Sequence, residues 1–469
     1  MTQSYIGDEQ KIAGTPTPVS VPTSDVSSAS DADHAGARGE VGPRAWYMLA
    51  ILTLIFILSF IDRSSLSLVA KLVKHDFAVS DYQMSFLLGA SFVLFYSTIS
   101  IPAGYLVDRF SRRGIVGWAV FAWSAMTVLC GLAKSYLQLF LGRAGVGIGE
   151  AALQPAAYSM IRDAFPPDRR GRAFGIYQMG PMVGVGFSLF IGGWLLKLSQ
   201  SGAIAHWPWL GSLRPWQFVI AVPGLIGLLI AALVLTMREP ARMIKQQASP
   251  QGGWPAYREA LAFAVREWRM YAPLWGAATL YAMAISGFNA WAPTVIAQTW
   301  HAPLSTVGRT FGPLMMVSVP TGLLVFGTVM DRRSRRNHSA APLEVAMATG
   351  VMACLATIAL AFVGSPFLAA ALYACHAFFS SPMPSSAGAT MAQITPGRLM
   401  GRLTSVFFLV QNLLGLALGP TMAILIAHLY GNDPHALRYG IVTLYSLCLS
   451  GAVILYVFAA RRVRSRRFE

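Results

Sequence analysis

Charged residues are scarce in this sequence of 469 residues, because Asp, Glu, Lys and Arg together make up only 12% of it. A soluble globular domain carries about 25%. Hydrophobic residues account for 55% and gather in repeated runs of roughly 20 residues, the length that crosses a bilayer as a helix. The runs lack the alternation of a membrane β-strand. The sequence therefore predicts an all-α membrane protein with many spans.

Acidic residues are scarcer than basic ones, with 20 Asp and Glu against 36 Lys and Arg and a formal net charge of +16. Such an excess can indicate nucleic-acid binding. Here the cations cluster in loops between the apolar runs, which is the pattern of the positive-inside rule. We therefore expect contact with membrane lipids and no nucleic-acid partner.

Cysteine and enzyme motifs are also poorly represented. The four cysteines all fall within apolar runs, with no disulfide or metal-ligand spacing. A Gly-x-x-x-x-Gly-Lys-Ser/Thr phosphate loop is missing from the sequence, which argues against ATP-driven transport by this chain. No nucleophile or base constellation emerges either. We expect neither an enzyme nor a bound metal or cofactor.

Polar segments divide the chain. Residues 1–43 are rich in Ser, Thr, Ala, Pro and Asp and lack an apolar core, so we expect a disordered cytoplasmic tail and no cleaved signal peptide. Residues 238–269 form the longest later interruption, and residues 461–469 are strongly basic. The expected domains are two six-helix halves, 44–237 and 270–460, joined by a cytoplasmic linker and followed by a basic cytoplasmic tail.

Twelve membrane helices are expected from the apolar runs. Their ranges are 45–69, 82–107, 115–132, 135–160, 173–196 and 218–237 in the first half, and 271–297, 304–330, 343–363, 367–394, 403–427 and 437–460 in the second. Glycine and proline inside 173–196 and 271–297 predict kinks or breaks there.

A polar motif follows the second run of each half with identical spacing. Its residues are Gly104, Asp108, Arg109, Arg112 and Arg113, and then Gly327, Asp331, Arg332, Arg335 and Arg336. Internal repetition of this kind is typical of transporters. We expect a gate, in which glycine permits close helix approach, the aspartate faces a helix N-terminus of the other half, and the arginines form ion pairs across the halves. A topology signal alone is the simpler alternative.

The orientation follows from the same cations. If both termini are cytoplasmic, then both motifs, the linker and the basic tail lie on one side, as the positive-inside rule requires. We expect a multi-pass protein of the cell inner (plasma) membrane, active as a monomer.

Ionisable residues also occur inside the expected helices. Asp62 lies in the first helix, and Arg143 and Glu150 lie in the fourth. A charge at membrane depth costs at least about 2.5 kcal/mol on insertion scales, so it marks function or a structural ion pair. Arg143 and Glu150 are about two turns apart and face the same way. We predict that Asp62 and Glu150 carry protons and that Arg143 pairs with either carboxylate or with an anionic head group.

Further polar or aromatic residues inside the helices are candidates for lining a substrate cavity. They are Arg63, Gln154, Tyr158, Gln178, Asn289, Trp291, Tyr373, His376 and Asn412. Interhelical hydrogen bonding is the alternative role for each of them. The histidine could titrate near neutral pH, or it could be a buried neutral side chain bonded to a carbonyl.

The repeated Gly-x-x-x-Asp-Arg-x-x-Arg-Arg pattern resembles the loop motif of the major facilitator superfamily. Three features together resemble the Spinster family within it: Asp62-Arg63, the segment Gly-Arg-Ala-Gly-Val-Gly-Ile-Gly-Glu-Ala at 142–151, and Asp-x-Phe-Pro-Pro-x-x-Arg-Gly-Arg at 163–172. The resemblance implies twelve helices in two pseudo-symmetric halves and secondary active transport by alternating access. Spinster proteins are linked to export of sphingolipids or lysophospholipids in animals, so the resemblance favours an amphipathic lipid of this kind without fixing the substrate. Proton coupling is expected from Asp62 and Glu150.

Two other functions share these features. One is proton-coupled transport of small organic anions or drugs, and the other is a membrane receptor or scaffold that does not transport. A lipid would need a largely apolar cavity with a side opening between helices. A small polar anion would need a closed polar pocket built from both halves.

Overall fold

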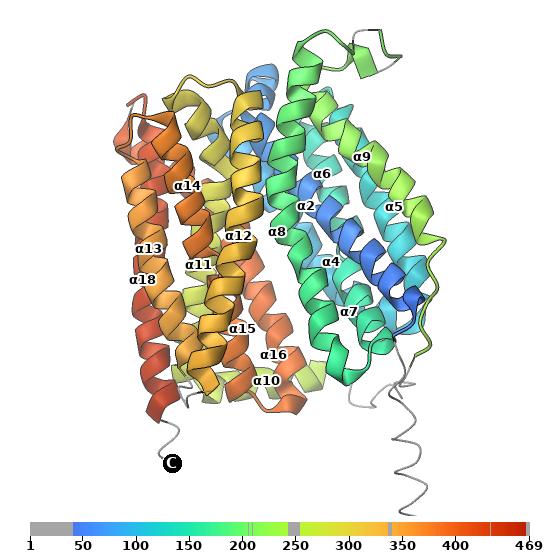
Figure 1. Cartoon of the computed structure of the whole chain (residues 1–469), viewed down its shortest axis with the longest axis vertical. Coiled ribbons are helices and arrows are strands. Elements are labelled where there is room, and N and C mark those ends of the chain that lie inside the picture. Colours follow the sequence, from blue (N-terminus) through green and yellow to red (C-terminus); the bar gives the residue numbers. More distant parts are fainter. Residues whose placement is uncertain are drawn as a thin grey trace, which may run out of the picture. The chain divides into compact units, whose positions relative to one another are not determined.

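Helices make up most of the chain, and no strand occurs in the residues that the structure describes (Figure 1). This computed structural model describes residues 41–204, 206–208, 210–242, 254–335, 340–431 and 433–465. The helical unit begins at Pro43, and its last described residue is Ser465. Nearly all of the expected N-terminal tail, residues 1–43, therefore lies outside the described residues. Part of the expected basic tail continues the last helix as far as Ser465.

The N-terminal half supplies the first six spans. Its elements are α2 (Pro43–Phe77), α3 (Asp81–Leu88), α4 (Ala90–Arg109), α5 (Arg112–Gly131), α6 (Tyr136–Glu150), α7 (Leu153–Ala164), α8 (Pro167–Gln200) and α9 (Pro215–Val234), with a 3-10 turn at Leu210–Ser212. Two of the predicted helices are divided: α3 and α4 form one span, and α6 and α7 form another. The second break directly follows Glu150.

The linker and the C-terminal half follow. The elements are α10 (Trp254–Arg266) in the linker, then α11 (Trp268–Thr299), α12 (Leu304–Arg335), α13 (Ala341–Leu360), α14 (Pro366–Ser380), α15 (Met383–Ile394), α16 (Gly397–Val410), a π-helical segment η2 (Gln411–Leu416), α17 (Gly419–Ala427) and α18 (Ala436–Ser465), with a 3-10 turn at His428–Tyr430. The predicted tenth span is divided into α14 and α15, and the eleventh is interrupted by the π-helical segment.

All twelve predicted spans are present as helix. Within the described residues, nine helical segments are long and apolar enough to cross a membrane. Of the other three spans, two are the divided helices α6–α7 and α14–α15. The third is α11, whose polar and aromatic side chains, Asn289 among them, make it less apolar. Polar residues in a spanning helix are expected where it faces other helices or a cavity and not lipid.

The two halves meet closely at one end of the bundle, where α8 ends and α12 begins. A Cβ atom added to Gly308 of α12 would lie 2.3 Å from the carbonyl oxygen of Leu189 in α8. A Cβ atom added to Gly89, between α3 and α4, would lie 2.5 Å from the carbonyl oxygen of Ala417. Only glycine permits such backbone contact. We call this the closed end, and it lies opposite the start of α2 (Figure 1).

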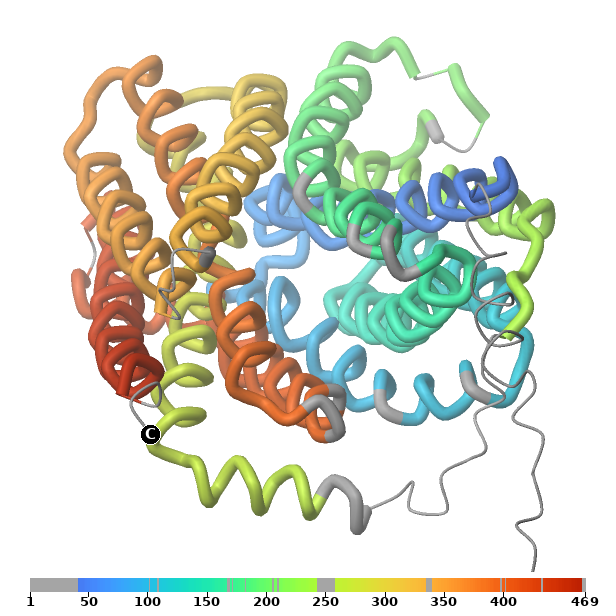
Figure 2. The backbone as a smooth tube through the Cα atoms, turned by 60° about the horizontal axis from the view of Figure 1, so that its bottom comes forward, coloured from blue at the N-terminus to red at the C-terminus, as the bar shows by residue number. Residues whose placement is uncertain are grey.

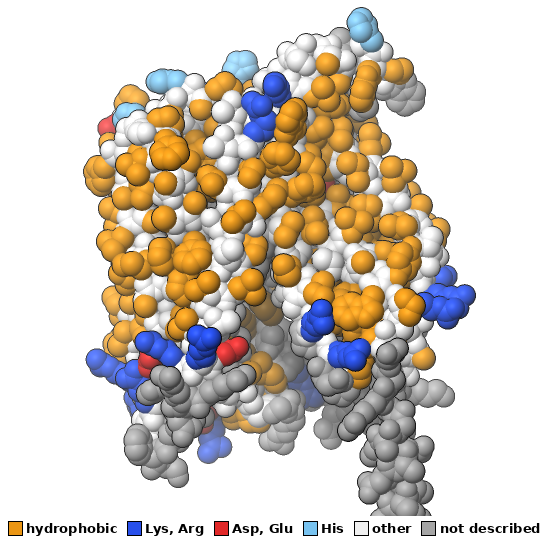
Figure 3. Space-filling view, viewed as in Figure 1, with side chains coloured by type: hydrophobic (Ala, Val, Ile, Leu, Met, Phe, Trp, Pro, Cys, Tyr) orange, Lys and Arg blue, Asp and Glu red, His pale blue; other side chains and the backbone are white. Residues whose placement is uncertain are grey.

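The other end carries most of the cations. Lys and Arg side chains gather there, and the surface between the halves is hollowed (Figure 3). The linker helix α10 runs across this end, where α18 also terminates (Figure 2). We call it the basic end. At this end neither motif glycine touches a neighbour: Cβ atoms added to Gly104 and Gly327 would meet no atom within 4 Å.

Candidate functional site

Glu150, the last residue of α6, points at α2 inside the N-terminal half. Its side chain is 1% exposed. Arg63 donates to Glu150 Oε2 from Nε at 2.8 Å and from Nη2 at 2.5 Å, and Ser59 Oγ donates to the same oxygen at 2.8 Å. Ser59 and Arg63 are four residues apart, so one face of α2 presents both donors. The Oε1 atom has no hydrogen-bond partner among the described residues.

Arg143 lies in the same cluster but is not the cation that pairs with Glu150. Its Nη1 donates to the backbone carbonyl oxygen of Asp62 at 3.1 Å, and its Nε lacks a partner in the described part of the chain. The buried Asp62 carboxylate turns towards α5, where Thr127 Oγ1 donates to Oδ2 at 3.3 Å. The structure thus brings together the three residues predicted to couple protons. In this conformation, however, the predicted Arg143 pair with either carboxylate is not formed.

Aromatic rings surround the Arg63 guanidinium. Its Cζ atom is 4.3 Å from the ring centroid of Phe92 and 4.9 Å from those of Phe60 and Tyr96. Cation–π contacts of this kind contribute about 0.5–2 kcal/mol, with the larger values at desolvated sites. The side chain stays 23% exposed although Glu150 is sealed. Arg63 therefore connects a buried acid to an open space.

That space is a cavity of about 190 Å³ between the two halves. Both arginines, Arg63 and Arg143, line it from the N-terminal half. Uncharged polar groups come from both halves, and they are Ser64, Ser67, Ser286, Asn289 and Tyr373. The remaining lining is apolar and includes Phe92, Leu189, Met315 and Pro420. The described lining thus combines a cationic patch on one side with a mainly apolar surface on the other.

Three of the predicted lining residues, Arg63, Asn289 and Tyr373, reach this cavity. Trp291 and His376 are buried elsewhere in helix contacts. The indole Nε1 of Trp291 donates to the carbonyl oxygen of Pro420 at 3.1 Å. His376 Nδ1 lies 2.8 Å from Thr357 Oγ1, and its ring lies 4.2 Å from that of Phe288. These two side chains contribute to packing of the C-terminal half.

The other predicted lining residues also lie outside that lining. Tyr158 contacts the rings of Phe174 and Tyr177. Gln154 and Asn412 are half-buried, and Gln178 is exposed. Spacing along the chain does not determine which polar residue of a helix faces the other half.

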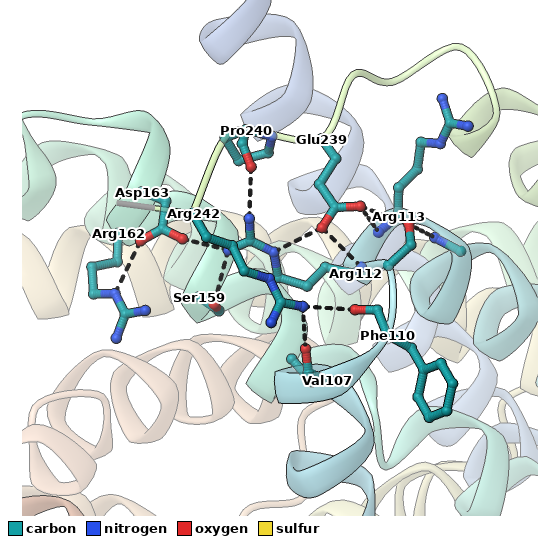
Figure 4. A network of polar contacts seen from close by, with 12 residues as sticks. Val107, Phe110, Arg112, Arg113, Ser159, Arg162, Asp163, Glu239, Pro240 and Arg242 are labelled. Carbon is teal, nitrogen blue, oxygen red and sulfur yellow. Dashed lines mark hydrogen bonds and ion pairs between the residues drawn. The ribbon is translucent and has the colours of Figure 1, made fainter. Parts of the chain in front are cut away.

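The first repeated motif builds a polar network at the basic end (Figure 4). Arg112 is 1% exposed and donates to Asp163 Oδ2 at 2.5 Å, to Glu239 Oε1 at 3.0 Å and to the carbonyl oxygen of Pro240 at 2.7 Å. Arg113 donates to the carbonyl oxygen of Met237 at 3.2 Å. All these partners belong to the N-terminal half or to the first residues of the linker, and none belongs to the C-terminal half. The expectation that these arginines pair across the halves is not met in this conformation.

Glu239 follows α9, outside the membrane-spanning helices. Partial burial raises the pKa of its carboxyl, but hydrogen bonds from Ser111, from the backbone of Arg112 and from its guanidinium outweigh burial and hold that pKa below its usual value. Ser111 Oγ donates to Glu239 Oε2 at 2.6 Å. Glu239 therefore fixes the end of α9 to the start of α5.

A smaller network lies beside the second repeated motif and is built from residues outside the repeated positions. Glu344, at the start of α13, accepts a hydrogen bond from Arg464 Nη2 at 2.5 Å and lies 3.9 Å from Arg333. Asp331 and Arg332 are exposed, and no salt bridge to either exists among the described residues. In the first motif, Arg109 stacks on Tyr105 at 4.3 Å. Arg336 lies outside the described residues, as do the side chains of Asp108 and Arg335, so their predicted roles stay predictions.

Sequence comparison places the chain among membrane transporters. The model of the Major Facilitator Superfamily matches residues 52–420. An MFS-type efflux pump of Mycolicibacterium smegmatis is 27% identical, covering 92% of this chain and 96% of that protein. A D-galactonate transporter of Escherichia coli is 24% identical, covering 90% of this chain and 97% of that protein. Protein spinster of Drosophila melanogaster is 26% identical over 50% of this chain and 34% of its own length.

Solved structures agree with this placement. A bacterial homologue of the human lysosomal transporter Spinster, in an inward-facing and unoccupied conformation, matches with a TM-score of 0.76 and 26% identity, covering 91% of this chain and 98% of that one. Its inward-facing and occupied form matches with a TM-score of 0.69. The predicted fold of two six-helix halves is thereby confirmed, and this chain belongs to the major facilitator superfamily as a Spinster-like transporter.

Proposed function

We propose that this protein is a proton-coupled transporter of an amphipathic anion such as a lysophospholipid. The observation that carries the proposal is the central cavity, where two arginines face a mainly apolar lining and one of them is paired with a buried acid. A head group would lie against Arg63 and Arg143. A cavity of about 190 Å³ is smaller than a pocket for a drug-sized ligand, so an acyl chain would extend beyond it.

The proposed orientation places both termini and the basic end in the cytoplasm of a bacterial-type inner membrane. The excess of cations at that end supports it through the positive-inside rule. With this orientation, the contact of α8 with α12 seals the outer side, and the open space at Gly104 and Gly327 lies on the inner side. The inward-facing forms of the similar bacterial transporter support the same reading.

Coupling would depend on the pairing of Arg63 with Glu150. While ionised, Glu150 holds the guanidinium through two hydrogen bonds to one oxygen. A proton on Glu150 removes the negative charge that this pairing needs, so Arg63 becomes available to an anion in the cavity. Loss of the proton returns Arg63 to Glu150 and releases the anion. Because arginine does not deprotonate in proteins, the proton of this pair is exchanged by Glu150 and not by Arg63.

Asp62 would be the second proton carrier of this site. Its Oδ1 atom has no hydrogen-bond partner in the described part of the chain, and the bond from Thr127 to Oδ2 is long. Arg143 binds the carbonyl oxygen of the same residue. A change of charge on Asp62 would therefore act directly beside the arginine that lines the cavity, while Arg143 itself keeps its charge throughout.

A small sugar acid is the second candidate substrate. Its carboxylate would use the same arginines, and Ser64, Ser67, Ser286 and Asn289 would meet its hydroxyl groups. The similarity to a D-galactonate transporter favours this candidate. The two candidates differ in how they use the apolar part of the cavity lining. A lipid would place apolar groups against it, whereas a sugar acid would leave it without a partner.

Transport into proteoliposomes tests both candidates. The full chain is reconstituted, a proton gradient is imposed, and uptake of a labelled lysophospholipid is compared with uptake of galactonate. We expect saturable, gradient-dependent movement of the lipid. Glu150→Gln should abolish its dependence on the gradient, since the glutamine cannot exchange a proton. Glu344→Gln removes an acid that also pairs with arginine but lies away from the cavity, and it should keep that dependence.

Two other results of this transport assay would change the proposal. Saturable movement of galactonate without lipid movement would replace the first substrate with the second. Gradient-driven uptake that persists in Glu150→Gln would remove this residue from the coupling mechanism, whichever substrate moves.

A further inference from the structure

A second site lies at the basic end, between the start of α11 and the end of α18. Two adjoining cavities of about 850 and 410 Å³ share Trp268, Arg269, Arg462 and Ser465, so they form one continuous groove. None of its lining residues lines the central cavity. The groove is therefore separate from the transport site.

The groove changes from apolar to basic along its length. On α18 its lining residues include Leu455, Phe458 and Arg462, spaced three and four residues apart and so on one face of the helix. From Leu455 to Arg462 the helix rises by about 10 Å. Such a length passes from hydrocarbon depth to head-group depth at a membrane surface. The 54% exposed Phe458 ring lies between Leu455 and Arg462 on this face.

The basic part of the groove carries unusually many unpaired cations. Four exposed arginines line it: Arg266, Arg269, Arg461 and Arg462. Glu267 is the one acid in the lining of these two cavities. No salt bridge to any of the four arginines occurs among the described residues. The described lining of the groove therefore carries a net positive charge.

Trp268 lines the groove together with these arginines. It is 59% exposed, and the Arg269 guanidinium lies 5.9 Å from its ring centroid. Tryptophan is enriched at the level of lipid head groups. The linker helix α10 runs across the basic end (Figure 2) and ends at Arg266, which lines the groove. An interfacial aromatic ring, basic side chains and an apolar wall are what a phospholipid meets on a protein that binds it.

We propose that this groove binds an anionic phospholipid of the bilayer. The phosphate accepts hydrogen bonds from the forked guanidinium groups, whose geometry matches phosphate. The acyl chain follows Leu455 and Phe458 along α18. The bound lipid connects α11 to α18 where the linker joins the C-terminal half. A soluble phosphate would leave the apolar wall without a partner, so the lipid is the occupant that uses the whole groove.

Native mass spectrometry of the purified full chain tests the proposal. The protein in detergent is titrated with phosphatidylglycerol and, separately, with phosphatidylcholine of the same chains. The wild type should retain the anionic lipid at least tenfold more tightly. The double variant Arg269→Gln/Arg462→Gln should lose that preference. Arg44→Gln/Arg238→Gln, which removes two exposed arginines from the same end outside the groove, should keep it.

Equal retention of both lipids by the wild type would overturn the proposal. Equal loss of preference in the two double variants would overturn it as well. Displacement of the lipid by soluble glycerol phosphate at comparable concentration would show recognition of phosphate alone and also overturn it. A second measurement does not depend on the arginine variants. Brominated phosphatidylglycerol should quench wild-type tryptophan fluorescence more than Trp268→Phe fluorescence. Brominated phosphatidylcholine should quench the two proteins alike, and equal quenching by both lipids contradicts the proposal.

Discussion

Arg63 holds two positions at once, because it binds the sealed Glu150 carboxylate and also lines the central cavity. The acid and an incoming anion therefore compete for one guanidinium group. A simple point charge would not reproduce the contacts of this guanidinium group. The Arg63 side chain donates twice to one Glu150 oxygen and stacks among three aromatic rings. The chemical form of the cation matters here as much as its charge.

Arg63→Lys tests that requirement. Lysine keeps the charge but loses the planar, forked donor and its stacking on Phe92. We expect the KM for the transported anion to rise about tenfold, equivalent to about 1.4 kcal/mol, with transport still dependent on the proton gradient. Arg172→Lys alters another arginine near an aromatic ring, at 5.7 Å from Trp46 and outside the cavity, and should leave KM unchanged. An unchanged KM in Arg63→Lys would remove Arg63 from the substrate site.

At the scale of elements, the contact of α8 with α12 brings the two halves together at the closed end. The contact depends on glycine at both faces. A Cβ atom on Gly312 would lie 2.6 Å from the carbonyl oxygen of Gly186 and 2.6 Å from the backbone nitrogen of Phe190. Backbone atoms cannot rotate away as a flexible side chain can, so the helices must separate to admit a methyl group.

Gly312→Ala should therefore favour a conformation in which α8 and α12 are separated and the closed end opens. Overpacking costs about 1–3 kcal/mol, which shifts a two-state population roughly 5- to 150-fold. For the measurement, the four native cysteines are replaced and Ser67→Cys is introduced in the cavity lining. An impermeant maleimide then labels this cysteine from the outer side. We expect faster labelling. Gly364→Ala adds the same methyl group where nothing lies within 4 Å and should not change the rate. Equal rates in both variants would contradict a role of the α8–α12 contact in sealing this end.

At the scale of the whole molecule, the sequence was sufficient for the architecture. Apolar runs determine the spans, and the repeated motif after the second run of each half reveals the two halves. The coupling cluster was predicted in part, because Asp62, Arg143 and Glu150 do meet. The partner of Glu150 was not predicted. It depends on the rotation of α2 against α6, and residues 87 apart carry no local signal of that contact.

The Arg112 network connects α5, α7 and the start of the linker at the basic end, and its acid Glu239 makes it sensitive to pH. The Glu239 pKa lies below its unfolded value because hydrogen bonds to the charged form outweigh burial. The stabilisation is therefore complete above the ordinary glutamate pKa of 4.5 and is lost as pH falls through the lower folded pKa. The charged groups around it are Arg112, Arg113 and, across Arg112, Asp163.

Glu239→Gln should lower the unfolding temperature of the detergent-purified protein at pH 7, because a neutral amide cannot replace charged acceptance from Arg112. The difference from the wild type should shrink as pH falls through the lowered folded pKa of Glu239, where the wild-type carboxyl also becomes neutral. Asp433→Asn alters an exposed acid that bonds only locally, to the backbone of His435, and provides the matched control. A difference that stayed constant from pH 7 to pH 3 would show that Glu239 acts through shape and not through its charge. The network would then hold α5, α7 and the end of α9 together without any dependence on protonation.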